Sequence, residues 1–138
     1  MALVLDTGPL VAGFDPSDPR HLECTQLIAS ARERRLIPAP VLVETDHLTR
    51  AHIGPDAFPA LLSDIRRGSY EVVELLAADY DRVREILETY RDLNVGFVDA
   101  AVLAIVERLG ESKLATLDRR HFGLLRPRHL ESIELLPA

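Results

Sequence analysis

The sequence is poor in cysteine and contains no long hydrophobic run. A single cysteine, Cys24, excludes an internal disulfide and a multi-cysteine zinc site, which favours a reducing compartment. The longest apolar run, AAVLAIV, is far shorter than the ~18 residues that a membrane span needs. The N-terminus also lacks a basic region before its apolar stretch, so it does not resemble a targeting signal. We therefore expect a soluble, cytoplasmic protein that does not contact a membrane.

The chain also has no linker, internal repeat or low-complexity tract. Its 138 residues, of which 47% are hydrophobic and 28% charged, fit one globular domain that spans residues 1–138. The formal net charge of −6 argues against a protein that holds nucleic acid by bulk electrostatics. The arginines nevertheless form clusters: Arg32, Arg34 and Arg35; Arg66 and Arg67; Arg119 and Arg120; Arg126 and Arg128. Each cluster is either a solvated helix end or part of a local rim that contacts phosphate around an acidic centre.

Strand-like and helical segments alternate along the chain. Short apolar runs predict five strands: LVLD at 3–6, RLIPAP at 35–40, YEVVELL at 70–76, KLATLD at 113–118 and SIELLP at 132–137. Apolar residues at helical spacing predict helices after the Gly8-Pro9 turn and at about 19–35, 40–50, 54–67, 78–93 and 97–110. Strands separated by helices of this length pair in parallel, with helices on both faces of the sheet. The sequence therefore predicts an α/β fold, a three-layer α/β/α domain with a central parallel sheet of about five strands.

Four acidic residues are expected at one edge of that sheet. Asp6 and Asp118 each end an apolar strand. Glu44 lies in about the first turn of the helix that Pro40 opens, and Asp99 lies near the start of another helix, in GFVDAAVLAIV. In a parallel sheet every crossover helix begins near the carboxyl ends of the strands, which is where open α/β folds bind ligands. We therefore expect the four carboxylates to converge.

Each of these acids also has a structural interpretation. Asp6 can accept hydrogen bonds from the turn or the helix start, Asp99 can complement the positive end of its helix, and Asp118 can begin the turn DRRH. Glu44 is harder to explain in this way, because we expect it to be semi-buried among Val and Leu without a neighbouring Lys or Arg. The coincidence of four acids favours a functional site.

The predicted carboxylate cluster indicates a metal site. Converging carboxylates raise one another's pKa, so an ionised cluster needs a cation. Carboxylate and water ligands without His or Cys select a hard ion such as Mg²⁺ or Mn²⁺. None of the five histidines occurs in a His-x-His or His-Glu-x-x-His pattern, which argues against zinc.

Four stretches of the chain carry a family resemblance. VLDTGPL, PVLVETDHL, GFVDAAVLA and ATLDRRHF resemble the acidic motifs of PIN-domain ribonucleases, and most closely those of VapC-type toxins from bacterial type II toxin–antitoxin pairs. The motifs follow the family order at family-like spacing, and the resemblance spans nearly the whole chain. It implies that the catalytic residues are the quartet Asp6, Glu44, Asp99 and Asp118.

Residues around the quartet agree with the resemblance in part. Thr7 and Thr116 match positions where PIN domains often carry hydroxyl residues near the site. Gly96 and Val98 depart from the pattern, since many members have Ser and Thr at these positions. A side-chain cap is therefore not expected at the start of this helix, although glycine is itself a tolerable N-cap.

The resemblance also implies a chemistry and a set of partners. The implied cofactor is Mg²⁺, with Mn²⁺ as a substitute, and its ligands are Asp6 and Asp99. Asp118 binds directly or through water, and Glu44 has an outer or second-metal role. The ion lowers the pKa of a bound water that attacks a phosphodiester bond, without a covalent enzyme intermediate. The implied partners are an RNA substrate, either tRNA or rRNA, whose cleavage inhibits translation; a small antitoxin protein whose tail blocks the acidic site; and a second copy of the chain.

Two alternatives remain open on the sequence alone. One is a PIN nuclease of RNA processing that has no antitoxin. The other is a non-enzymatic phospho-acceptor receiver domain, which also gathers acids at the edge of a parallel sheet. Receivers have paired acids after the first strand and a lysine after a late strand, whereas here Thr7 follows Asp6 and the sole lysine, Lys113, begins a strand.

Overall fold

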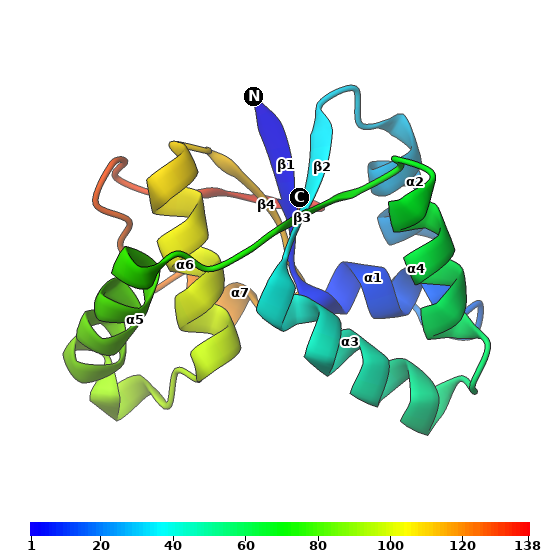
Figure 1. Ribbon diagram of the computed structural model, residues 1–138, viewed down its shortest axis with the longest axis horizontal. Coiled ribbons are helices and arrows are strands. Elements are labelled where there is room, and N and C mark those ends of the chain that lie inside the picture. The colour runs from blue at the N-terminus through cyan, green and yellow to red at the C-terminus, as the bar shows by residue number, and fades with distance from the viewer.

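The computed structural model covers residues 1–138 and contains one five-stranded sheet (Figure 1). All neighbouring strands pair in parallel, in the order β3-β2-β1-β4-β5. The strands are β1 (Ala2–Leu5), β2 (Arg34–Pro38), β3 (Glu71–Val73), β4 (Lys113–Ala115) and β5 (Glu134–Leu136). Each strand coincides with one of the five predicted segments, so the number and direction of the strands are confirmed.

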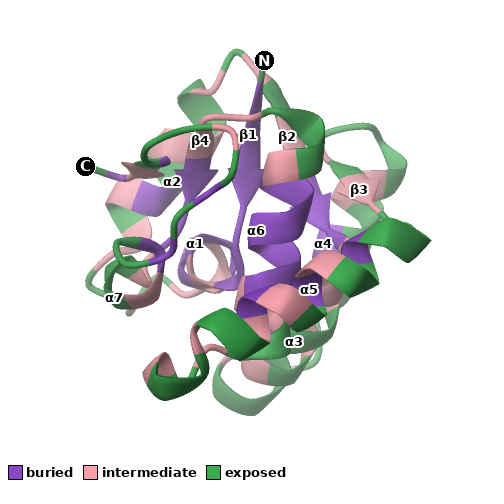
Figure 2. Ribbon diagram, turned by 90° about the vertical axis from the view of Figure 1, so that its left-hand side faces the viewer, coloured by how far each residue is buried: buried purple, intermediate pink, exposed green.

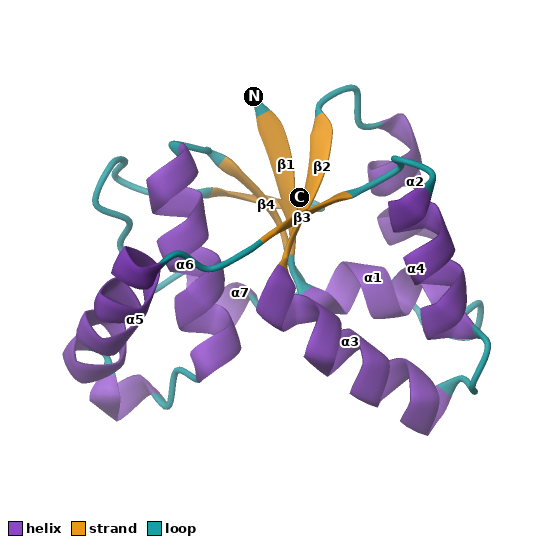
Figure 3. Ribbon diagram, viewed as in Figure 1, coloured by secondary structure: helices purple, strands orange, loops and turns teal.

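Helices cover both faces of this sheet. The α-helices are α1 (Thr7–Phe14), α2 (His21–Ser30), α3 (Ala39–His52), α4 (Ala57–Arg66), α5 (Ala77–Thr89), α6 (Phe97–Leu109) and α7 (Arg119–Phe122), and a short 3₁₀ helix, η1 (Arg91–Leu93), follows α5. Figure 3 shows α5 and α6 on one side of the strands and α1 to α4 on the other. The predicted three-layer α/β/α architecture is confirmed. No helix combines the length and the apolar character that a bilayer crossing requires.

The core is centred on β1 and α6. β1 is the middle strand of the sheet, and all four of its residues are buried. α6 is buried without interruption from Ala100 to Val106, and Figure 2 shows most of its length in the buried colour. A helix that is covered on all sides is apolar all round, which explains the continuous run AAVLAIV. Asp99, in the first turn of α6, is therefore carried by the most enclosed helix of the fold.

Several element boundaries differ from the predictions. α1 begins at Thr7, so Gly8 and Pro9 lie in its first turn and not in a turn before it; α4 begins at Ala57 and not at 54, and α5 ends at Thr89 and not near 93. α2 ends at Ser30 and not near residue 35, because Arg35 belongs to β2. The Arg35 guanidinium donates to the carbonyls of Ile28 (2.8 Å) and Ala31 (2.9 Å), so it satisfies the carbonyl groups left free where α2 ends. The short helix α7 falls where the sequence indicates only a turn, since four residues are too few for a helical pattern.

The carboxyl ends of β1 and β4 define the edge of the sheet that matters for function. The register pairs Leu5 with Ala115, so Asp6 and Thr116 leave the sheet side by side. The order of the strands changes direction at β1, with β2 and β3 to one side and β4 and β5 to the other. Open α/β sheets bind ligands outside the carboxyl ends of the strands at such a point.

Candidate active site

The four predicted acids all follow strands or begin helices at this edge. Asp6 comes directly after β1, and Asp118 lies three residues beyond the end of β4. Asp99 is in the first turn of α6. Glu44 is the sixth residue of α3, which begins directly after β2. Their backbones therefore stand where the carboxyl ends of the parallel strands meet the helix starts.

Asp6 is buried, with only 5% of its surface exposed. It occupies the N-cap position of α1, but its carboxylate makes no capping hydrogen bond. The carboxylate instead accepts a hydrogen bond of 2.8 Å from the hydroxyl of Thr116. Burial raises the pKa of Asp6 to about 6 against the lowering effect of this hydrogen bond, and the charges of Asp99 and Glu44 add to the increase. A backbone contact from Thr7, the first residue of α1, also lowers this pKa, so the helix start accounts for the environment of the carboxylate only in part.

Thr116 connects Asp6 to the turn that carries Asp118. Its buried hydroxyl donates to Oδ2 of Asp6 and accepts a 3.0 Å hydrogen bond from the backbone amide of Asp118. The amide of Asp6 donates to the carbonyl of Ala115, which extends the β1–β4 ladder by one bond. One hydroxyl and one ladder bond therefore fix the end of β1 relative to the turn after β4.

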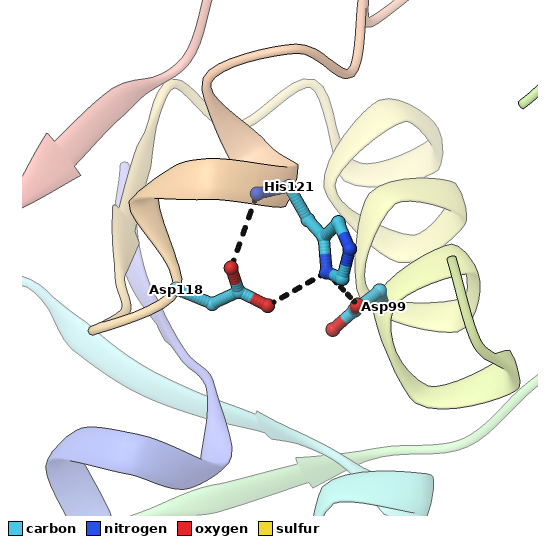
Figure 4. A group of neighbouring side chains, drawn as sticks. All are labelled: Asp99, Asp118 and His121. Carbon is cyan, nitrogen blue, oxygen red and sulfur yellow. Dashed lines mark hydrogen bonds and ion pairs between the residues drawn. The ribbon is translucent and has the colours of Figure 1, made fainter. Parts of the chain in front are cut away.

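Asp99, Asp118 and His121 form a compact group (Figure 4). One ligand atom from each of the three side chains lies within 4.8 Å of the others. Nδ1 of His121 is 2.9 Å from Oδ2 of Asp118 and 3.1 Å from Oδ2 of Asp99. Burial raises the pKa of Asp99, and the negative charge of Asp118 raises it further. The group therefore brings two carboxylates and one ring nitrogen to a single point.

Both the side chain and the backbone of His121 are hydrogen-bonded. Its Nε2 donates to the carbonyl of Leu93 at 3.1 Å, and its backbone amide donates to Oδ1 of Asp118 at 3.1 Å. The second bond caps α7, so the interpretation that Asp118 begins the turn DRRH holds for one of its two oxygens. Partial burial lowers the pKa of the imidazole, but the hydrogen bond and charge of Asp118 and the charge of Asp99 outweigh it, so the net shift is upward.

Glu44 is exposed, and the expectation of a semi-buried side chain is wrong. The buried face of α3 is the stripe Val41, Thr45 and Thr49, at a spacing of four residues, and Glu44 lies outside it. Val43, next to Glu44, is 75% exposed. Glu44 lines an open pocket of about 600 Å³ together with residues of α3, the start of α5 and the start of α6. It is not part of the compact group around His121.

Comparison with known proteins settles the family. The family model of the PIN domain matches residues 3–125. The chain belongs to the PIN-domain family. It is 33% identical over 125 residues to Ribonuclease VapC26 of Mycobacterium tuberculosis (strain ATCC 25618 / H37Rv), and this stretch covers 91% of the present chain and 93% of that protein. The PIN match decides against the receiver alternative.

Solved structures share the fold of this PIN domain. VapC20 of Mycobacterium tuberculosis, a sarcin-ricin loop cleaving toxin, has a TM-score of 0.74 at 24% identity and covers 82% of this chain and 87% of its own. VapBC2 of Rickettsia felis, bound to a promoter DNA fragment, has a TM-score of 0.69 at 20% identity and covers 98% of each chain. A toxin–antitoxin complex from Klebsiella pneumoniae has a TM-score of 0.67 at 18% identity and covers 91% of this chain and 92% of its own.

The donor set of this PIN domain fits a divalent cation. Asp99, Asp118 and His121 supply two carboxylate oxygens and a nitrogen. Asp6 lies outside this compact group, but its pKa responds to the charge of Asp99. Thr7 Oγ1, next to Asp6 in the sequence, is buried without a hydrogen-bond partner, which is expected where an ion or its water completes a site. Raised carboxyl pKa values and an unsatisfied hydroxyl are both features that cation binding relieves.

The sequence patterns do not single out His121. It matches neither a His-x-His nor a His-Glu-x-x-His pattern, and its partner Leu93 is 28 residues away in the sequence. Its local signals are its place in the stretch ATLDRRHF and its spacing of three residues from Asp118, which places both on one side of a single helical turn. That spacing could have indicated a shared site once a helix was expected there.

Proposed function

We propose that this PIN domain is a divalent-metal-dependent endoribonuclease that acts as the toxin of a toxin–antitoxin pair. The observation that carries the proposal is the carboxylate group at the carboxyl ends of β1 and β4, where Asp6 and Asp99 both have raised pKa values. Such a group favours a cation with oxygen ligands. The similarity to Ribonuclease VapC26 supports RNA as the substrate.

In this mechanism the side chains bind the metal ion and keep one another in position. Asp6, Asp99 and Asp118 would hold the ion, Mg²⁺ or Mn²⁺. Thr116 keeps Asp6 in place relative to the turn of Asp118. A bound divalent ion lowers the pKa of a water molecule and neutralises the charge that builds on the phosphate oxygens. Glu44, open to solvent at the same edge, has an outer role or binds a second ion. The reaction is hydrolysis, and no side chain forms a covalent bond with the RNA.

Phosphate contact is proposed for Arg120 and not for Arg119, although both follow Asp118 directly. Arg120 is exposed and takes part in no ion pair or side-chain hydrogen bond. The guanidinium of Arg119 donates to the carbonyls of Leu135 and Pro137, so it holds the C-terminal strand against α7. Arg119 therefore has neither of the two roles predicted for the arginine clusters, because its guanidinium is used in a structural contact. Arg120 is free to meet a phosphate.

The proposed partners are a structured RNA, either tRNA or rRNA, a small antitoxin and a second copy of the chain. The structural relatives include a sarcin-ricin loop cleaving toxin and a toxin–antitoxin complex, which supports the first two. An arginine on an antitoxin tail can supply the positive charge that the acidic site needs. A short upstream reading frame that encodes a DNA-binding segment and a flexible tail distinguishes a toxin from a PIN nuclease of RNA processing.

Cleavage assays with purified protein test the proposed activity. We expect RNA cleavage with Mg²⁺ or Mn²⁺, none in excess chelator, and at least a ~100-fold lower rate for Asp99→Asn, because this substitution keeps the shape and removes the charge. The matched control is Asp81→Asn, an exposed acid on α5 without an ion pair, which should cleave at the wild-type rate. Undiminished cleavage in excess chelator contradicts the mechanism.

A further inference from the structure

The orientation of His121 is set by a contact outside the acid group. Because the carbonyl of Leu93 can only accept, Nε2 carries the hydrogen of this 3.1 Å bond. The bond leaves Nδ1, the other ring nitrogen, facing the carboxylates of Asp99 and Asp118. Histidines that bind metal through one nitrogen usually donate the other N–H to a carbonyl or a carboxylate. His121 already has that second contact.

A turn in the backbone supplies the Leu93 carbonyl. Leu93 ends η1, and Asn94 follows it in the left-handed region with φ 55°. Asparagine tolerates this conformation better than most residues. The reversal of the chain lies two residues before Gly96, the N-cap of α6, so the acceptor for His121 and the helix that carries Asp99 are joined by a short segment. The histidine and the carboxylate are therefore oriented by one connected piece of backbone.

The distances suit a shared ion. Nδ1 is 2.9 Å from a carboxylate oxygen of Asp118 and 3.1 Å from a carboxylate oxygen of Asp99. Adjacent ligands of an octahedral ion with bonds of about 2.1 Å are about 3 Å apart. These separations also suit hydrogen bonds, so the distances permit coordination, and the fixed Nε2–H contact is what favours it.

We propose that His121 is a direct ligand of the divalent ion through Nδ1, beside Asp99 and Asp118, and that this nitrogen shifts the preference of the site from Mg²⁺ towards Mn²⁺. The inference rests on the proposed metal-dependent function. Mg²⁺ prefers ligands that are all oxygen, whereas imidazole nitrogen is a better ligand for ions later in the first transition row. The ion would then have a nitrogen ligand, in contrast to the donor set of carboxylates and water that the sequence predicts.

Pulsed electron paramagnetic resonance of the full chain loaded with Mn²⁺ tests coordination directly. In a buffer without nitrogen ligands, we expect ¹⁴N modulation from a bound imidazole, replaced by a ¹⁵N signal after selective labelling of histidine. Bound Mn²⁺ without nitrogen coupling overturns the inference and leaves the proposed function intact. Absence of any Mn²⁺ binding overturns both.

Metal titrations of variants provide the second measurement. For His121→Ala we expect the affinity for Mn²⁺ to fall about 10- to 100-fold and that for Mg²⁺ to fall much less, so that the preference for Mn²⁺ narrows. The matched control is His52→Ala, an exposed histidine at the end of α3 without a hydrogen bond, which should bind both ions as the wild type does. If His121→Ala binds both ions as tightly as the wild type or more tightly, His121 is only a counter-charge that leaves when an ion enters, and the inference is wrong.

Discussion

The ionisation of Asp6 opposes folding when no cation is present. Its pKa is about 6 in the folded protein, compared with 3.8 for an unperturbed carboxyl. An acid whose pKa is higher in the folded state binds more protons in the folded state than in the unfolded state. The free energy of unfolding therefore falls as the pH rises from about 4 to 6. The difference between the two pKa values corresponds to a loss of about 3 kcal/mol in the free energy of unfolding at neutral pH. A residue retained only for structure would not be expected to weaken the fold in this way.

Asp6→Asn should therefore raise the melting temperature of the metal-free protein at pH 7 and change it little at pH 4. Asparagine keeps an acceptor for the Thr116 hydroxyl and removes the charge. Divalent ion should raise the melting temperature of the wild type, because binding to the folded state stabilises it, and should raise that of the variant much less. Thermal melts of both proteins at pH 4 and pH 7, with chelator and with Mg²⁺, measure the effect of the substitution at each pH and the effect of the ion on each protein.

If Asp6→Asn lowers the melting temperature, the role of Asp6 is to stabilise the turn after β1. Loss of a structural hydrogen-bond acceptor costs about 1 kcal/mol whether or not metal is present. Equal destabilisation of Asp6→Asn in chelator and in Mg²⁺, together with a wild type that does not respond to the ion, would remove Asp6 from the proposed ligand set.

At the level of elements, the start of α1 and the turn after β4 pack too closely for a side chain between them. A Cβ at Gly8 would lie 3.1 Å from the Cβ and Cγ atoms of Leu117. Leu117 stands between Thr116 and Asp118, so its displacement moves both of them. A side chain at Gly8 would therefore require Leu117 to shift by a few tenths of an ångström.

Gly8→Ala should weaken metal binding several-fold while the melting temperature changes little. The gain in helix propensity, up to about 1 kcal/mol, offsets part of the strain at Leu117. Gly13→Ala, in the same helix, is the control, because a Cβ there meets nothing within 4 Å. Isothermal titration with Mn²⁺ measures the affinities. Equal affinities for the two variants would show that Leu117 yields without moving its neighbours.

The position of α6 depends on an ion pair at its far end. Arg108 Nε donates to both oxygens of buried Asp79 at 3.0 and 3.1 Å, and Nη2 of the same guanidinium donates to the carbonyl of Glu74. Asp79 also accepts from the amide of Leu76 at the start of α5. These contacts join the end of α6 to the start of α5, at the opposite end of α6 from Asp99.

Arg108→Ala should lower the free energy of unfolding by about 3 kcal/mol, because it leaves a buried carboxylate without its ion partner. The control is Arg84→Ala, which breaks an exposed pair with Glu88 and should cost less than about 0.5 kcal/mol. Urea unfolding curves measure both. A cost for Arg108→Ala as small as the control would mean that water replaces the guanidinium around Asp79.

The sequence predicts those elements whose signal is local and periodic. Five apolar strands and the long helices between them are recognisable, because burial on one or both faces imposes a period on the residues. The end of α2 is not, since it depends on Arg35, a residue of the next strand. The exposure of Glu44 also escapes prediction, because the apolar Val43 beside it faces solvent. The place of His121 in the group is settled only by the fold, which brings Asp99 of α6 within 3.1 Å of Nδ1.

For the whole molecule, negative charge limits how RNA can be held. The net charge is −6, and most arginines outside the site already pair with carboxylates or donate to backbone carbonyls. Arg34 pairs with Glu71, Arg82 with Glu107, and Arg128 with Glu85. On the elements around His121, the exposed arginines with neither an ion pair nor a side-chain hydrogen bond are Arg91 on η1 and Arg120 on α7. Few phosphates can therefore be neutralised at once.

RNA binding should accordingly depend weakly on salt, and Arg120 should account for a measurable share of that dependence. Each neutralised phosphate contributes about −0.7 to −0.9 to the slope of log K against log salt concentration, so two contacts give a slope between about −1 and −2. In an Asp99→Asn background, which binds without cleaving, Arg120→Ala should make the slope about 0.7 to 0.9 shallower. Arg66→Ala, an exposed and unpaired arginine on α4, should leave it unchanged. Fluorescence anisotropy with a labelled RNA hairpin over a series of KCl concentrations gives the slopes. A steep slope that neither variant alters would mean that the phosphates are neutralised elsewhere, by a surface that this acidic chain forms only with a second copy of itself.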